Sequence, residues 1–159
     1  SNCSAAWRKP LNIDPGESTV HVHHCLLLPV LVLLGACAGP LPAVDPQQAW
    51  IDLATAPGNV LMADRLDNRS VNDGRYFQVS PGEHDLQVRL QFDVPSGGQD
   101  GMAELQTRTC RLHLRFPAFV AGQRYLLKAG QQGYRPWARL YDSQQQVLVR
   151  GKTLRCGSI

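Results

Sequence analysis

Residues 86–92 read Leu-Gln-Val-Arg-Leu-Gln-Phe, and residues 110–116 read Cys-Arg-Leu-His-Leu-Arg-Phe. In both stretches apolar and polar side chains alternate with a period of two. This alternation is typical of a strand that lies with one face on a core and the other in solvent. Each stretch therefore predicts a half-buried β-strand.

Shorter stretches on either side extend this pattern, and we expect strands at 49–54, 59–66, 123–129, 137–142 and 146–155. Turn residues lie between them: Asp73-Gly74 suits a tight hairpin, Pro81-Gly82-Glu83-His84 a reverse turn, and 96–101 a flexible loop. No stretch has a convincing helical period, although residues 46–54 could begin as a short helix. Short strands at near-regular spacing predict an all-β fold, an antiparallel β-sandwich with a small barrel as the alternative.

The composition agrees with one folded domain. The chain has 159 residues, 43% hydrophobic and 18% charged, which is too apolar and too evenly charged for a disordered tail. A net charge of +3 is too small to indicate a nucleic-acid-binding protein, and we expect no nucleic-acid partner.

The small net charge hides an uneven distribution. Residues 37–104 hold four arginines against ten Asp and Glu, a net charge of −6, whereas residues 105–159 hold ten Lys and Arg against Asp142 alone, a net charge of +9. One interpretation is that strands of the two halves pair and their charges interleave. The other is a basic face, mostly Arg, that binds phosphates or carboxylates.

Near the N-terminus, residues 25–36 form a run of twelve uncharged residues. As a helix the run would span roughly 18 Å at about 1.5 Å per residue, which is shorter than the roughly 30 Å hydrocarbon core of a bilayer. Its length fits the apolar region of a secretory signal peptide. The alternative is that the run is a buried element of the fold and Cys37 an ordinary core cysteine.

The residues that follow, Leu34-Gly35-Ala36-Cys37, resemble the lipobox of bacterial lipoproteins. The resemblance implies that residues 1–36 are removed and that Cys37 becomes the lipid-modified first residue. The Pro-containing stretch 38–44 would then tether a domain at 45–159 to the membrane. Because Ala38 rather than Asp follows the cysteine, the resemblance also implies an outer-membrane lipoprotein that faces the periplasm.

In such a mature chain Cys110 and Cys156 are the two remaining thiols. An oxidising periplasm favours a disulfide between them. In the chain-entropy model, closing this loop would stabilise the folded state by about 3 to 4 kcal/mol. The alternative is two reduced, buried cysteines. No Cys-x-x-Cys or Cys/His spacing indicates zinc, and we expect no metal and no cofactor.

A second resemblance concerns the domain. Residues 79–88 (Val-Ser-Pro-Gly-Glu-His-Asp-Leu-Gln-Val) and 116–127 resemble strands of PEGA-like sandwich modules in bacterial envelope proteins, among them uncharacterised periplasmic lipoproteins. The resemblance implies a β-sandwich. These modules share no catalytic residues, so it implies no active site.

The residues themselves also give no catalytic candidate. His84 lies at the expected turn and His113 on the polar face of an expected strand, positions that favour solvation or turn bonding. No serine lies in a Gly-x-Ser-x-Gly elbow, and no Ser-x-x-Lys occurs. Acidic pairs such as Asp64/Asp67 and Asp93/Asp100 fit loop and edge positions as well as they fit acid and base pairs.

One group of residues indicates a binding surface: Tyr134, Arg135, Trp137 and Arg139 follow a Gly-rich turn. Exposed aromatic and Arg side chains in loops often bind glycans or peptides. The alternative is that Trp137 closes one end of the sandwich and Tyr141 packs beneath it.

Together these features predict a lipid-anchored envelope module that binds a partner or has a structural role and has no catalytic activity. Its membrane contact would be the lipid on Cys37, and its partner an envelope protein, peptidoglycan or lipopolysaccharide. Two alternatives are an accessory protein for secretion or envelope assembly and a hydrolase of envelope polymers.

Overall fold

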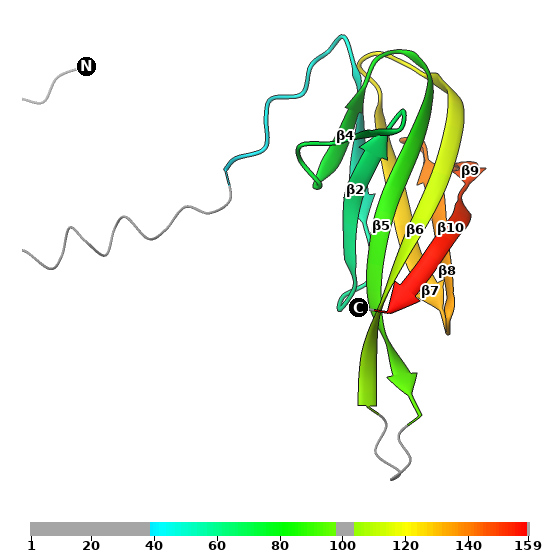
Figure 1. Ribbon diagram of the computed structural model, residues 1–159. Helices are drawn as coiled ribbons and strands as arrows, with labels where there is room; N and C mark the ends of the chain where they lie inside the picture. Colours follow the sequence, from blue (N-terminus) through cyan, green and yellow to red (C-terminus); the bar gives the residue numbers. More distant parts are fainter. Residues whose placement is uncertain (1–38, 98–103, 159) are drawn as a thin grey trace, which may run out of the picture. The chain divides into compact units, whose positions relative to one another are not determined.

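The computed structural model describes residues 39–97 and 104–158 (Figure 1). The expected signal segment 1–36 and the lipidation site Cys37 lie outside the described residues, so both stay predictions. The chain from Ala43 onward forms one compact unit. In the part that the structure describes, no helix has the length and apolarity needed to span a bilayer.

The described strands form two five-stranded sheets. The β1 sheet has the order β4 (Tyr76–Val79), β1 (Ala49–Ala54), β7 (Arg124–Gln132), β8 (Arg135–Tyr141), β9 (Val147–Arg150). The β5 sheet has the order β10 (Lys152–Ser158), β6 (Glu104–Phe119), β5 (Gly82–Ser96), β2 (Val60–Leu66), β3 (Arg69–Ser70). Neighbouring strands are antiparallel except β1 and β7, which are parallel. The all-β sandwich is confirmed, and the barrel alternative is wrong because the two sheets stay separate.

The core lies between the two sheets and follows the alternation of the sequence. On β5 and β6 the buried side chains are Leu86, Val88, Leu90, Phe92, Val94, Cys110, Leu112, Leu114 and Phe119. The β1 sheet contributes Ile51, Phe77, Leu127 and Leu140, each at most 1% exposed. Burial of this apolar surface is the main favourable contribution to folding, at about 25 cal/mol per Å².

The hairpin of β5 and β6 is the longest element. Its register runs from Gly82 opposite Phe119 to Ser96 opposite Glu104. In this register the buried Leu90 lies opposite the buried Cys110. Since side chains alternate along a strand, the intervening polar side chains of both strands point away from the core on a shared outer face.

The disulfide between Cys110 and Cys156 is confirmed. It joins β6 to β10, where the two residues lie opposite each other with Cα atoms 4.1 Å apart. The alternative of two reduced cysteines is therefore wrong. Because the bridge links directly opposite residues, it fixes the register of β10 on β6.

The expected strand at 146–155 is wrong as a single element. The chain forms β9 in the β1 sheet and β10 in the β5 sheet, and Gly151 lies between them. A Cβ on Gly151 would lie 3.1 Å from Ala138 Cβ and 3.1 Å from Leu114 Cγ. The chain therefore passes from one sheet to the other at a place where any side chain would crowd Ala138 and Leu114.

Three smaller expectations are also corrected. Asp73-Gly74 lies in the connection from β3 to β4, which belong to different sheets, so it forms no hairpin. The tight hairpin lies instead at Asp67 and Asn68, whose φ values of 48° and 66° suit a two-residue turn. Pro81 to His84 is not a simple turn, because β5 already begins at Gly82. Residues 46–48 form turns rather than the start of a helix, and a strand follows at 49.

Candidate anion-binding face

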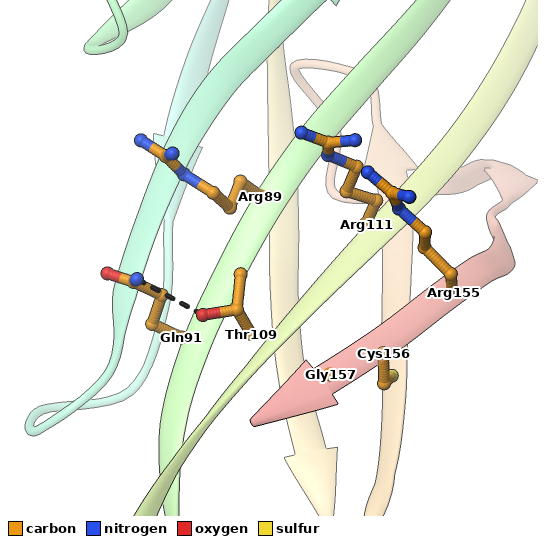
Figure 2. Close-up of a pocket in the computed structure, with 7 residues that line it drawn as sticks. All are labelled: Arg89, Gln91, Thr109, Arg111, Arg155, Cys156 and Gly157. Carbon is orange, nitrogen blue, oxygen red and sulfur yellow. Dashed lines mark hydrogen bonds between the residues drawn. The ribbon is translucent and has the colours of Figure 1, made fainter. Parts of the chain in front are cut away.

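Three arginines lie side by side on the outer face of the β5 sheet (Figure 2). Arg89 on β5 lies opposite Arg111 on β6, and Arg111 lies opposite Arg155 on β10. We call these three residues the arginine row. Neighbouring strands are about 4.8 Å apart, so the row crosses roughly 10 Å of the sheet.

The row carries more positive than negative charge. Asp64 Oδ2 lies 3.3 Å from Arg111 Nε, and the two side chains are 20% and 34% exposed. Ala63 is buried in the core, so alternation along β2 places Asp64 on the outer face of the sheet, where it contacts Arg111. Within the described residues no carboxylate lies within ion-pair distance of Arg89 or Arg155. Among the described residues, the three guanidinium groups therefore have one carboxylate in contact, Asp64 at Arg111.

Arg89 has an unusual environment for a surface arginine. Its Nε is shielded from solvent and has no hydrogen-bond partner, and its Nη2 lies 3.4 Å from the sulfur of Met62. A thioether sulfur is a weak acceptor, and a charged donor left unsatisfied costs free energy. The partly exposed guanidinium of Arg89 therefore has no strong acceptor among the described residues.

A groove of about 470 Å³ lies over the row. Besides the three arginines, its lining includes Gln91, Thr109 and the backbone around Gly157 (Figure 2). Gln91 Nε2 donates to Thr109 Oγ1 across 3.2 Å, so these two side chains are held on the same face. The groove offers amide and hydroxyl groups next to guanidinium groups, a combination suited to phosphate or carboxylate oxygens.

Elsewhere the charges of the two halves interleave across the sheets. Arg115 Nη2 donates to Glu83 Oε1 across 2.6 Å, and Arg124 Nε donates to Asp52 Oδ2 across 2.6 Å. Both contacts hold the pKa of the carboxyl below its usual value. The interpretation that charges of the two halves interleave across paired strands therefore describes these ion pairs. It does not describe Arg89 and Arg155, which have no such carboxylate partner among the described residues.

The structure separates the four residues expected to form a binding surface. Tyr134 lies in the turn between β7 and β8, is 55% exposed, and donates to Pro95 O across 3.0 Å. Arg135, Trp137 and Arg139 lie at alternate positions of β8 and so share the outer face of the β1 sheet. Tyr134 therefore does not belong to the surface that the other three share.

Trp137 is half-buried on this outer face rather than inside the sandwich, so the end-plug alternative is wrong. Its ring lies against Gly130, where an added Cβ would be 3.0 Å from Trp137 Cζ2. The guanidinium carbon of Arg139 lies 5.2 Å from the ring centroid. Gly130 thus makes room for the indole ring, and Arg139 covers it.

His84 joins two turns. Its Nδ1 lies 2.7 Å from Asp67 Oδ2, and its Nε2 lies 3.0 Å from both Ser80 Oγ and Ser80 O. Burial acts to raise the pKa of Asp67, but the backbone N–H of Asp85 and the His84 ring together hold it below its usual value. Ser80, His84 and Asp67 are thus in contact in the order of an acyl-transfer relay, although Ser80 and His84 are only four residues apart.

The other histidine also has a carboxylate partner: His113 Nε2 lies 2.8 Å from Asp85 Oδ1. Within residues 39–97 and 104–158 no group of three or more His, Cys, Asp or Glu side chains is placed to hold a metal ion. The expectations of no metal and no cofactor stay predictions for the whole chain.

Comparison of the chain with protein-family models, curated proteins and solved structures finds no match. The resemblances to bacterial lipoproteins and to PEGA-like modules therefore stay predictions. We therefore infer the function from the geometry of the outer faces of the two sheets.

Sequence reasoning missed the arginine row, although its signals were present. Arg89 and Arg111 both lie at outward positions of the two stretches that predicted the sheet. Once Cys110 and Cys156 are taken as opposite, antiparallel pairing places Arg111 opposite Arg155. The register between β5 and β6 had no comparable marker, so the position of Arg89 in the row could not be derived.

Proposed function

We propose that the chain is a lipid-anchored binding module of the cell envelope, held at the outer membrane through Cys37 and facing the periplasm. Its sandwich binds a phosphate-bearing ligand and catalyses no reaction. The observation that carries the binding role is the arginine row, in which Arg111 contacts one carboxylate while Arg89 and Arg155 contact none among the described residues.

Repulsion among the three arginines lowers the stability of the fold unless an anion lies between them. Like charges directly opposite each other on neighbouring strands are destabilising by up to about 1 kcal/mol per pair. The row contains two such contacts, Arg89 with Arg111 and Arg111 with Arg155. An anion placed between neighbouring guanidinium groups replaces repulsion by charge-assisted hydrogen bonds, which supports a binding role rather than a structural one.

Phosphate suits the row better than a single carboxylate does. The three arginines start from neighbouring strands about 4.8 Å apart, and a phosphate has several oxygens that can each accept from a guanidinium N–H. The phosphates of lipopolysaccharide are envelope ligands of this kind. Peptidoglycan carboxylates and an acidic partner protein offer the same charge with less acceptor capacity.

The binding site is tested by arginine-specific modification with phenylglyoxal, read by mass spectrometry with and without inorganic diphosphate. We expect diphosphate to protect Arg89, Arg111 and Arg155. Arg135, which is exposed and lies outside the row, serves as the internal control and should be modified equally in both conditions. Equal modification of all four arginines would refute the site.

Lipid anchoring needs a separate test, because it rests on the sequence around Cys37. Intact mass of the protein extracted from membranes should correspond to residues 37–159 plus lipid, less two hydrogens for the disulfide. A mass that retains residues 25–36 would refute the anchoring and leave the binding role to be judged by itself.

A hydrolase is the second candidate, favoured by the contacts of His84 with Ser80 and Asp67. In that function Ser80 would be the nucleophile and His84 the base. Labelling of Ser80 by a fluorophosphonate, lost in His84→Ala, would support it. Absence of labelling would refute it and leave the binding module.

A further inference from the structure

A second row of cations lies on the β1 sheet. Lys128 on β7 lies opposite Arg139 on β8, and Arg139 lies opposite Arg150 on β9. We call these three residues the second cationic row. Like the arginine row, it crosses three neighbouring strands and places like charges opposite each other at both contacts.

The second cationic row has no carboxylate in contact. In the described part of the chain no Asp or Glu lies within ion-pair distance of its three residues. Lys128 Nζ instead donates to Gln145 Oε1 across 3.1 Å and lies 5.0 Å from the centroid of the Tyr141 ring. These neighbours orient Lys128 and leave its positive charge uncompensated.

Aromatic rings position the row on the sheet. Arg139 lies over Trp137, which itself lies against Gly130, and Lys128 lies over Tyr141. Cation–π contacts hold a cation in place without neutralising it. Two of the three cations, Lys128 and Arg139, are therefore held in place and still available to an anion.

The two rows face in opposite directions. Leu127, Ala129, Ala138 and Leu140 are buried in the core, so the side chains of Lys128 and Arg139 at intervening positions point outward from the β1 sheet. By the same alternation Arg89 and Arg111 point outward from the β5 sheet. Figure 1 shows β7, β8 and β9 behind β5, β6 and β10, so the sandwich separates the rows.

We propose that Lys128, Arg139 and Arg150 form a second phosphate-binding site, and that one domain thereby binds two segments of a phosphate-bearing polymer at the same time. The inference rests on the proposed function for the arginine row. Because the sheets of a sandwich pack about 10 Å apart and the rows lie on their outer faces, no short ligand reaches both. Two sites facing apart suit the crosslinking of polymer chains.

Calorimetric titration of the full chain with inorganic tripolyphosphate counts the sites. We expect two ligands per chain for the wild type, and one for either Lys128→Gln/Arg139→Gln/Arg150→Gln or Arg89→Gln/Arg111→Gln/Arg155→Gln. The control Arg115→Gln/Arg124→Gln/Arg135→Gln removes the same net charge outside both rows and should keep two sites.

The outcomes separate the two proposals. One ligand per wild-type chain, lost only when the arginine row is changed, would overturn the second site and leave the proposed function standing. One ligand lost only when the second cationic row is changed would overturn the proposed function. No binding at all would overturn both.

Long-chain polyphosphate tests the crosslinking. Light scattering should rise when the wild type is mixed with the polymer at low salt and fall again as salt is added. Either single-row variant should bind the polymer without a rise in scattering. A rise that persists in both single-row variants would overturn the two-faced arrangement.

Discussion

Arg89 and Arg111 lie directly opposite each other on β5 and β6, with both side chains on the outer face of the sheet. Asp64 contacts Arg111, and the Nε of Arg89 is buried without an acceptor. A sheet selected for stability alone gains nothing from this pair. Mutation of Arg89 can therefore show whether the Arg89 and Arg111 pair serves ligand binding or the stability of the fold.

Arg89→Gln should not weaken the fold. It removes the repulsion from Arg111, so we expect the free energy of unfolding without ligand to stay the same or rise by up to about 1 kcal/mol. Urea unfolding in phosphate-free buffer measures this. Diphosphate protection of Arg155 from phenylglyoxal should weaken in the same variant. A loss of stability above about 1.5 kcal/mol would show that Arg89 serves the fold instead.

Asp64→Asn should strengthen ligand binding. Asp64 is the carboxylate beside the row, and its negative charge competes with the ligand for Arg111. For a unit charge about 5 Å from the anion, Coulomb's law gives roughly 1 kcal/mol at an effective dielectric constant of about 80 and roughly 3 kcal/mol at about 20, so we expect binding to tighten by at least about fivefold. A diphosphate titration followed at the Arg155 side chain by NMR measures the affinity. Weaker binding in the variant would contradict the assignment of the site.

Removing the disulfide should destabilise the domain. Cys110 and Cys156 are separated by 46 positions, so Cys110→Ala/Cys156→Ala should lose about 3 to 4 kcal/mol by the chain-entropy estimate. Urea unfolding of the oxidised wild type and of the variant gives the difference. Because the bridge also holds Arg155 opposite Arg111, the variant should bind diphosphate less tightly. An unchanged unfolding midpoint would contradict the structural role of the bridge.

The Asp52 and Arg124 pair should contribute to stability only above the acidic range. The hydrogen bond from Arg124 holds the pKa of Asp52 below its usual value of 3.8. A carboxyl with a depressed folded-state pKa stabilises the fold above its unfolded pKa and loses that contribution as pH falls through the folded value. Since both side chains are substantially exposed, we expect Asp52→Asn to cost less than about 1 kcal/mol at pH 7. Urea unfolding at pH 7 and at pH 2.5 should show this difference shrinking at the lower pH, and a difference that grows there would contradict the pair's role.

Sequence patterning predicted the centre of the fold well. Leu90 and Cys110 are both 0% exposed, as their alternating neighbours implied. Gly151 interrupts 146–155, but a glycine inside a strand pattern also fits a bulge, so the sequence did not show that the chain changes sheet there. The alternation of apolar and polar residues indicates which face of a sheet a side chain lies on, but it does not indicate which sheet the strand joins.

The candidate sites depended on contacts between distant parts of the chain. Tyr134 was grouped with Trp137 because they are neighbours in sequence, yet its partner Pro95 lies 39 positions away. His84 was expected to be solvated or to bond within its turn. It does contact Ser80, but it also contacts Asp67, 17 positions away in another turn. Such contacts follow from sheet register, which a single sequence leaves open except where a disulfide marks it.

The most direct test of anion binding by the arginine row is an NMR titration that follows the Nε–Hε signals of the arginine side chains as inorganic diphosphate is added. We expect saturable shifts at Arg89, Arg111 and Arg155, with an affinity that falls as salt is raised. Arg115 and Arg124, which already have carboxylate partners, should shift little. Saturable binding that leaves the signals of the arginine row unmoved would contradict the central claim.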